Sequence, residues 1–298
     1  MLPVHVFSSA EASLRQTLEE EGLDAAKERI VALALPALML VPQRAAPKTF
    51  ASQIGGDPWL PPGDWPGVPL TGAAPKAKAK PAPAPPPAKA IKATKASKTA
   101  KAIKEAEPSL PYGLVAQIPI RDLPRIPGVE FPPRGTLWFY FNEAAKPMGA
   151  VIHSDILPAD LVVRPRPDAA PTFTPRAVRY EPILTLPLPG SAAHSKLKLR
   201  GADVARYERA VDKNCAAHSG VQLFGHPSLP ELSAKTAKGA DVISQLGGKE
   251  GKDDHILILE IDGKSELGWS KPGTLYFAIP RDALGKGQLE RAVAVIQR

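Results

Sequence analysis

The chain has 298 residues, 44% of them hydrophobic, which is enough for one large domain or two smaller domains with substantial cores. Its 35 prolines and its 6% of aromatic residues favour short strands, turns and long connections over a helical bundle. The single cysteine, Cys215, excludes an intramolecular disulfide, and the first residues lack the basic and apolar regions of a secretory signal.

The net charge of +8 is concentrated in one stretch of the chain. Residues 73–107 contain nine Lys, two Glu and no Arg, a net +7, so the rest of the chain is close to neutral. This stretch is rich in Ala and Pro and has few apolar residues for a core, so we predict a disordered insert. Within it, lysines recur every third residue, a spacing that lines one edge of a polyproline II helix. They are Lys89, Lys92, Lys95, Lys98, Lys101 and Lys104.

Two interpretations of this insert stay open: a binding element for nucleic acid or another polyanion, and a solvated linker. No aromatic residue interleaves the lysines, so nothing indicates that bases are recognised. We favour the linker and expect weak, non-specific binding of polyanions in either case.

The N-terminal region predicts two helices followed by a strand. Ser8 and Glu11 have the spacing of a capping box, so we expect a helix capped by Ser8, and a second helix capped by Asp24. The apolar run over residues 30–41 is interrupted by Pro36 and is too short to span a membrane. Its last part is typical of a buried strand.

The next segment, residues 52–70, has paired glycines, five prolines and two tryptophans. The glycines and prolines argue against regular structure, and tryptophans are too large to leave in water. We therefore expect an ordered loop held to the body by its tryptophans.

Beyond the insert, the pattern is that of strands rich in β-branched and aromatic residues. We predict strands over 113–120, 135–142, 149–155, 176–187, 255–262, 273–280 and the C-terminal segment, and a helix over 201–217.

One pattern occurs twice: "GTLWFYF" at 135–141 matches "GTLYFAI" at 273–279, and each follows an apolar strand. This repetition predicts an internally duplicated β-unit. We expect an α+β fold of two related antiparallel sheets packed together, with N-terminal and peripheral helices outside. The predicted organisation is one domain made of residues 1–72 and 108–298, interrupted by the insert at 73–107.

Several motifs together resemble the YwqG-like family, a bacterial family of unknown function. They are "SQIGGDPWLPPGDWP", "LVAQIPIRDLP", "PPRGTLWFYFN", "HSGVQLFGHPSLPE" and "HILILEIDGKSELGWSKPGTLYFAIPRDAL", which span most of the chain from Ser52 onwards. The resemblance implies an α+β fold, a cytoplasmic location and no assigned activity. It also implies a possible antidote-like role towards a protein partner, which is suspected for some relatives.

The chain departs from the family pattern at two turns. The family often has a Gly-Tyr-Pro-Asp turn and a Trp-Gly-Asp segment, where this chain has "FGHPSL" at 224–229 and "LGWSKPG" at 267–273. If those acidic residues have a chemical role in relatives, that role is either missing from this chain or carried by other residues. The insert at 73–107 is also outside the family pattern.

The sequence contains few residues that could carry catalysis or bind a metal. Cys215, His218, His226 and His255 are the main candidates, but the paired cysteines of most zinc sites are absent, and no acid is identified to orient a Cys–His nucleophile. We predict no metal, no cofactor and no catalytic residue. Carboxylates at strand ends, such as Glu260, are expected to face water.

The tryptophans near the family motifs are expected mainly to close the core over loops. The functional alternative is a groove between the two repeats that holds a peptide or a protein partner. Its candidate residues are Gln117, Gly225, His226, Pro227 and Trp269.

We therefore expect a cytoplasmic binding protein without enzymatic activity, with a protein partner and no membrane span. The first alternative is a nucleic-acid-associated accessory protein that uses the cationic insert. An enzyme with a scattered active site is the second alternative.

Overall fold

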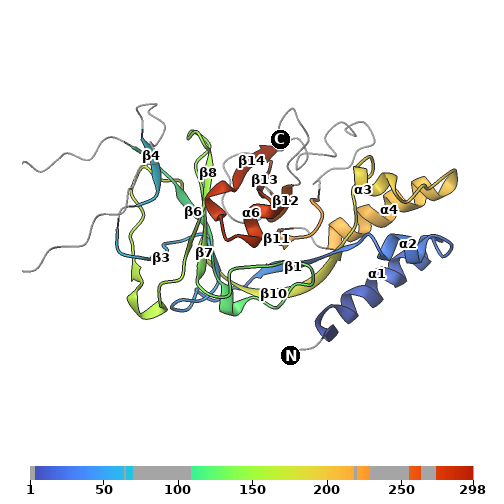
Figure 1. Cartoon of the computed structure of the whole chain (residues 1–298), viewed down its shortest axis with the longest axis horizontal. Helices are drawn as coiled ribbons and strands as arrows, with labels where there is room; N and C mark the ends of the chain where they lie inside the picture. Colours follow the sequence, from blue (N-terminus) through green and yellow to red (C-terminus); the bar gives the residue numbers. More distant parts are fainter. Residues whose placement is uncertain are drawn as a thin grey trace, which may run out of the picture.

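Ten antiparallel strands form one sheet that curves until it is nearly closed like a barrel (Figure 1). The computed structural model describes residues 4–63, 65–69, 109–217, 220–228, 255–262 and 273–297. The ten strands are β1 (Leu35–Pro42), β2 (Gln53–Ile54), β6 (Gly113–Pro119), β7 (Thr136–Phe141), β8 (Gly149–Ser154), β10 (Arg176–Thr185), β11 (Val221–Phe224), β12 (His255–Ile261), β13 (Thr274–Pro280) and β14 (Val293–Gln297).

Shorter elements surround this sheet. Two small sheets pair β3 (Trp59–Leu60) with β9 (Val162–Val163), and β4 (Gly67–Pro69) with β5 (Ser109–Pro111). The α-helices are α1 (Ser8–Glu20), α2 (Lys27–Val31), α3 (Ala192–Ser195), α4 (Ala202–Ala217) and α6 (Arg281–Gly285). The 3₁₀ helices are η1 (Val4–Phe7), η2 (Ile120–Asp122), η3 (Pro158–Asp160) and η5 (Leu289–Arg291).

The strand order has the same arrangement on both sides of a central pair. From the centre outwards, one side runs β10, β2, β6, β7, β8 and the other runs β1, β11, β12, β13, β14. The central pair joins β1 to β10 over eight residue pairs, from Leu35 opposite Thr185 to Pro42 opposite Val178. The expectation of two separate, packed sheets is therefore wrong, because this ladder joins the two groups of strands edge to edge.

The outermost strands meet on the far side of the barrel, at β8 and β14. A Cβ atom on Gly149 would lie only 2.5 Å from the Cβ of Ala294, which is closer than real side chains approach. Glycine at this position therefore allows the curved sheet to come close to closure.

Along each strand, successive side chains point alternately to the inside and the outside of the curved sheet. In β7, Leu137, Phe139 and Phe141 belong to the main core, whereas Trp138 and Tyr140 lie in a second cluster on the opposite face. β13 repeats this pattern, with Leu275, Phe277 and Ile279 in the main core and Tyr276 on the other face. The two halves meet inside the core, where the rings of Phe139 and Phe277 lie edge to face with centroids 5.4 Å apart.

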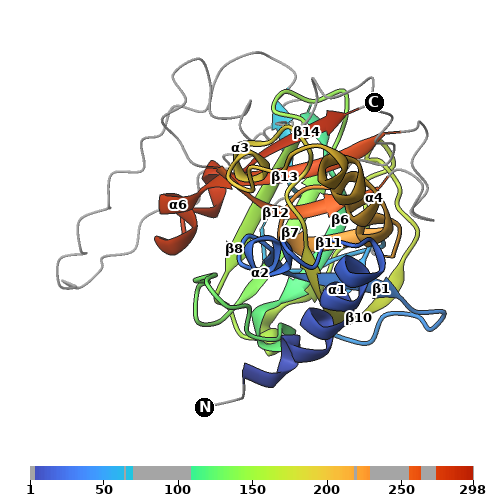
Figure 2. The ribbon, with the colours of Figure 1, turned by 90° about the vertical axis from the view of Figure 1, so that its right-hand side faces the viewer.

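The helices α1, α2 and α4 form a separate layer at one end of the sheet, in front of the strands in Figure 2. Their buried residues form their own cluster, which includes Leu18, Ile30 and Tyr207. Burial of each such side chain contributes roughly 1.5–3 kcal/mol, so this apolar face explains why the short helix α2 is stable. Among the described residues, none of the helices combines the length and the apolar character needed to cross a bilayer.

Both predicted helix caps are wrong. The residue before α1 is Phe7, and α2 begins at Lys27 after Ala26, with no side-chain cap on either helix. The turn η1 runs directly into α1, so Ser8 is already in a helical conformation, and Glu11 pairs with Arg15 instead.

The segment after β1 is more regular than its composition predicts, since it contains the short strands β2, β3 and β4. Its tryptophans do pack onto the body: the indole of Trp65 donates a 2.8 Å hydrogen bond to the Tyr112 carbonyl. The insert at 73–107, with its six regularly spaced lysines, lies outside the described residues.

Candidate functional site

A tight turn follows β2, and the side chain of Gln53 holds it. Gln53 Nε2 donates to the carbonyls of Gly55 (2.9 Å) and Asp57 (3.1 Å). Gly55 and Gly56 have φ angles of +62° and +75°, in the left-handed region where glycine is favoured. The turn therefore depends both on glycine and on one buried amide.

Gln117, on the neighbouring strand β6, attaches the end of this first turn to the sheet. Its Oε1 accepts hydrogen bonds from Trp59 N (2.8 Å) and from the indole of Trp138 (3.0 Å). The same indole contacts the Trp59 carbonyl at 2.9 Å. The Trp59 ring packs against Phe50, with centroids 4.4 Å apart, so aromatic side chains cover the first turn.

A second turn follows β11 with the same geometry. Gln222 Nε2 donates to the carbonyls of Phe224 (3.2 Å) and His226 (2.8 Å). Phe224 and Gly225 have φ angles of +62° and +80°. The motif of Gln, two left-handed residues and a proline therefore occurs once in each half of the sheet.

Glu260, on β12, has the place in the second turn that Gln117 has in the first. Its carboxyl accepts a 2.9 Å hydrogen bond from Ser228 N and a second hydrogen bond from the Ser228 hydroxyl. Tyr276 replaces the indole of Trp138, and its hydroxyl donates to the Ser228 carbonyl at 2.8 Å. Ser228 itself stands where the first turn has the large side chain of Trp59.

The Glu260 carboxyl is almost completely buried, with 2% of its surface exposed. The expectation that it faces water is therefore wrong. Burial raises the pKa of Glu260 to about 8, although its hydrogen bonds from Ser228 favour the charged form. Among the described residues, no basic side chain forms an ion pair with Glu260.

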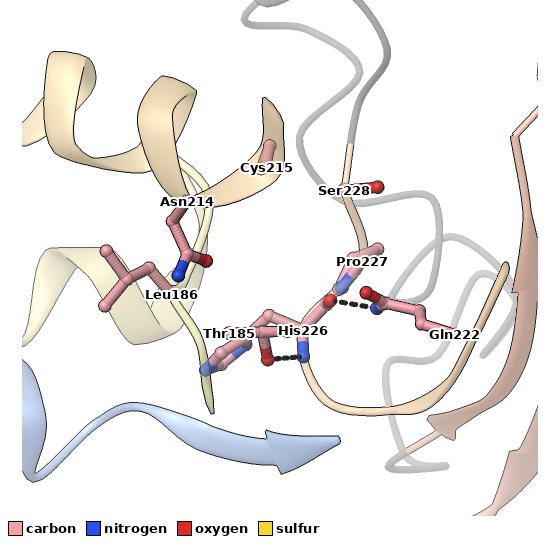
Figure 3. A pocket seen from close by; sticks show the side chains of 8 residues that line it. All are labelled: Thr185, Leu186, Asn214, Cys215, Gln222, His226, Pro227 and Ser228. Atoms are coloured by element: carbon pink, nitrogen blue, oxygen red, sulfur yellow. Dashed lines mark hydrogen bonds between the residues drawn. The ribbon is translucent and has the colours of Figure 1, made fainter. Parts of the chain in front are cut away.

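A small pocket opens beside the second turn, between that turn and the end of α4 (Figure 3). The space that it encloses is about 10 Å³, far below the ~300–1,000 Å³ of sites for drug-sized ligands. It has room for about one water molecule or a polar group of that size. The lining residues are Thr185, Leu186, Asn214, Cys215, Gln222, His226, Pro227 and Ser228.

Two titratable residues in the pocket are held neutral. His226 Nε2 donates to the Leu33 carbonyl at 2.9 Å, and burial lowers the pKa of His226 despite this hydrogen bond. Burial, followed by the negative charges of Glu260 and Asp212, raises the pKa of the Cys215 thiol to about 12. A thiol of this kind is a poor nucleophile at neutral pH.

The structure places the predicted groove residues at two separate turns. Gln117 supports the first turn, whereas Gly225, His226 and Pro227 form the second, where His226 and Pro227 line the pocket. Gly225 lies against Thr185, where a Cβ atom would come within 2.5 Å of the hydroxyl oxygen. Trp269 lies outside the described residues.

Sequence reasoning missed Glu260, Gln222 and Asn214. A signal for the first two is present, because "QIGGDP" at 53–58 and "QLFGHP" at 222–227 share the pattern Gln-x-x-Gly-x-Pro. Aligning "AQIP" with "LEID" then sets Gln117 opposite Glu260. Asn214 is on α4, and no repeat indicates its role.

The chemistry available at the second turn is hydrogen bonding together with one ionisable carboxyl. Over the described residues, no cluster of three or more His, Cys, Asp or Glu side chains is arranged to hold a metal ion.

The fold and the two turns define a class: an α+β protein with one curved antiparallel sheet and a Gln-supported turn in each half. The chain belongs to the family described as "Domain of unknown function (DUF1963)", whose model matches residues 52–297. This match covers both turns and every strand of the sheet except β1. No curated protein matches the chain.

Proposed function

We propose that this chain is a cytoplasmic YwqG-like binding protein, without enzymatic activity, that captures a protein partner at the pocket beside its second turn. The observation that carries the proposal is the difference between the two turns. Both are built on the same hydrogen bonds, but Trp59 covers the first, whereas Ser228 leaves a pocket at the second. The scaffold therefore does not require the pocket, which points to selection for binding.

We also propose that the two halves are copies of one β-unit. Corresponding strands flank the central pair, and the ladder irregularity between Leu114 and Ala116 in β6 recurs between Leu257 and Leu259 in β12. A duplicated unit leaves one copy free to change while the other maintains the fold. The open second turn fits this division.

The size of the pocket favours a protein partner. A space that admits only one water-sized group gives little affinity alone, so a specific partner must also contact the surface around it. One buried anchor surrounded by such contacts is typical of protein interfaces.

The test is affinity capture from the source cells with wild-type protein and with Ser228→Trp, which introduces the residue type of the first turn. Loss of a partner that the wild type retains supports the proposal. Ser13→Trp, on the exposed face of α1, is the matched control and should retain the partner. Equal capture by the wild type and Ser228→Trp would refute the proposal, provided that both have the same melting temperature.

A second candidate function rests on the charge of the insert. Nine lysines within residues 73–107 favour an accessory role at nucleic acid or another polyanion. Deleting 73–107 distinguishes the candidates: partner capture through the pocket survives the deletion, whereas retention on polyanions is lost. If all nine lysines contact duplex DNA, the slope of log affinity against log salt is about −8.

A further inference from the structure

A loop of basic residues lies in the helical layer, between α3 and α4. Lys196, Lys198 and Arg200 are exposed, whereas the residues between them face the layer: Leu197 is 1% exposed, and Leu199 packs against the helical cluster. The leucines hold the backbone of the loop in place by burial. The three charged side chains therefore project from a fixed segment.

A fourth cation joins this loop from α2. The guanidinium of Arg29, an exposed residue, donates a 3.0 Å hydrogen bond to the Leu197 carbonyl. This contact brings Arg29 to the loop, although it is distant in the sequence. We call Arg29, Lys196, Lys198 and Arg200 the basic patch.

The basic patch differs from the other cations of the helical layer, because those are paired. Every other Lys or Arg on α1, α2 and α4 has an acidic partner: they are Arg15, Lys27, Arg206, Arg209 and Lys213. Within the part of the chain that the structure describes, no member of the basic patch forms an ion pair. Its positive charge is therefore available to an anionic partner.

The composition of the loop indicates the class of that partner. The centre of a protein–protein interface is rich in apolar and aromatic residues and depleted in charge. Between Lys196 and Arg200 the loop presents only charged side chains to the solvent, since its leucines face the helical cluster. Such a surface binds by charge alone, which favours a dense, regular array of anions such as the phosphate backbone of a nucleic acid.

An anionic bilayer offers a similar array but fits the helical layer less well. The same layer carries the exposed acids Glu20, Asp24 and Glu28. A flat membrane that faced the layer would bring these carboxylates towards its own negative charge. A duplex is a rod and contacts a narrow strip of surface, so it can meet the basic patch without covering the acids.

We propose that the basic patch binds the phosphate backbone of a nucleic-acid duplex, without regard to base sequence. The patch is separate from the insert, because the helical layer and β4, the strand that precedes the insert, lie at opposite ends of the molecule (Figure 1). The inference goes beyond the proposed function, since it concerns another surface and another class of partner. Four contacts alone bind weakly, so this binding is measured at low salt, and retention at physiological salt still depends on the insert.

The test measures fluorescence anisotropy of a labelled, mixed-sequence DNA duplex of about 20 base pairs over about 20 to 100 mM salt. The protein is the full-length chain with the nine lysines of residues 73–107 replaced by Gln, so that binding reports on the body. We expect a slope of log affinity against log salt between about −3 and −4, as four phosphate contacts require.

The decisive variant adds Lys196→Gln, Lys198→Gln and Arg200→Gln to this protein. Its slope should be less negative by about 3, and its affinity at the lowest salt at least about tenfold weaker. The matched control adds Lys48→Gln, Arg125→Gln and Lys146→Gln, three exposed residues on loops outside the helical layer. It loses the same net charge and should keep the slope.

Three outcomes would overturn the inference. They are absence of duplex binding by the protein with the neutral insert, equal changes of slope in the two triple variants, and binding of phosphatidylserine vesicles through the patch in place of DNA. If a triple variant does not fold, NMR of the protein with the neutral insert decides: DNA should shift the amide signals of Lys198 and Gly201 but not the indole signal of Trp65. Partner capture by Ser228→Trp is a separate measurement, so either proposal can fail without the other.

Discussion

The first and second turns follow the same backbone path but differ in what surrounds them. In the first, Trp59 and Trp138 enclose a neutral amide, and in the second, Ser228 and Tyr276 surround a carboxyl beside a pocket. The Gln side chain that bridges two carbonyls and the left-handed backbone are common to both, so they are structural, whereas the covering residues are free to vary.

Even the left-handed position differs in how strictly it requires glycine. Gly55 and Phe224 have the same φ of +62°, yet a Cβ on Gly55 would lie 2.6 Å from the carbonyl oxygens of Phe173 and Thr174. Phe224 instead has space for a ring, which packs edge to face on Phe131 at 4.8 Å. The first turn is thus closely packed at its first left-handed residue, against the chain that leads into β10, whereas the second turn is closely packed at its second, Gly225, against Thr185.

The largest expected effect comes from Gly55→Ala. The left-handed conformation costs about 1–2 kcal/mol for alanine, and the contacts with two backbone carbonyls add about 1–3 kcal/mol, so we expect a loss of about 2–5 kcal/mol in the free energy of unfolding. Urea denaturation measures it. Gly201→Ala is the control: its φ is +56°, but no atom lies near its Cβ position, so it should lose only about 1–2 kcal/mol. Equal losses for the two variants would show that the close contacts at Gly55 add nothing to the cost of the left-handed conformation.

Trp138→Phe should have the next largest effect, a loss of about 3 kcal/mol. The substitution removes both hydrogen bonds of the indole, leaves the Trp59 carbonyl without this donor, and creates space in a fully buried position. Urea denaturation should show a lower midpoint with an unchanged slope. A loss below 1 kcal/mol would mean that the aromatic cover is not what stabilises the first turn.

Most strands could be predicted from the sequence, because β6, β7, β12 and β13 are runs rich in β-branched and aromatic residues that turn residues bound at their ends. The joining of the two groups of strands into one sheet could not, since the ladder between β1 and β10 pairs segments about 140 residues apart, and local periodicity contains no information on that pairing. The prediction that Ser8 caps the first helix failed for a local reason, because η1 continues directly into α1.

The site was less predictable than the fold. His226 and Pro227 could be found from the family motif, but their position beside Asn214 depends on how α4 packs against the sheet. Glu260 was overlooked because acidic residues near strand ends usually face water. Only the alignment of the two halves shows that it replaces a buried Gln.

Glu260→Gln should increase stability as the pH rises, by about 2 kcal/mol already at pH 6. The folded-state pKa of Glu260, about 8, lies above its ordinary value of 4.5. Its stabilising contribution is therefore complete below about pH 4.5 and is lost as the pH rises through about 8, whereas Gln does not titrate. The measurement is the difference in unfolding free energy between variant and wild type from pH 5 to pH 9, which should grow with pH.

The reciprocal variant, Gln117→Glu, places a buried, ionisable carboxyl in the first turn. Its difference from the wild type should change with pH in the opposite direction, becoming more destabilising as the pH rises. Differences that stay constant over this range for both variants would show that neither buried position disfavours a charge, and the distinction between the turns would then be one of shape alone.

The smallest expected effect is that of Tyr276→Phe, a loss of about 1 kcal/mol. The ring remains in place, and only the hydrogen bond from the hydroxyl to the Ser228 carbonyl is removed. Because the pocket lies beside Ser228, water can reach this carbonyl more easily than it reaches the carbonyl of Trp59, which aromatic rings cover. Tyr207→Phe is the control, since its hydroxyl donates to the Pro187 carbonyl from the separate helical cluster. If Tyr276→Phe destabilises the protein as much as Trp138→Phe does, the second turn is as tightly sealed as the first, and the case for an open binding pocket is lost.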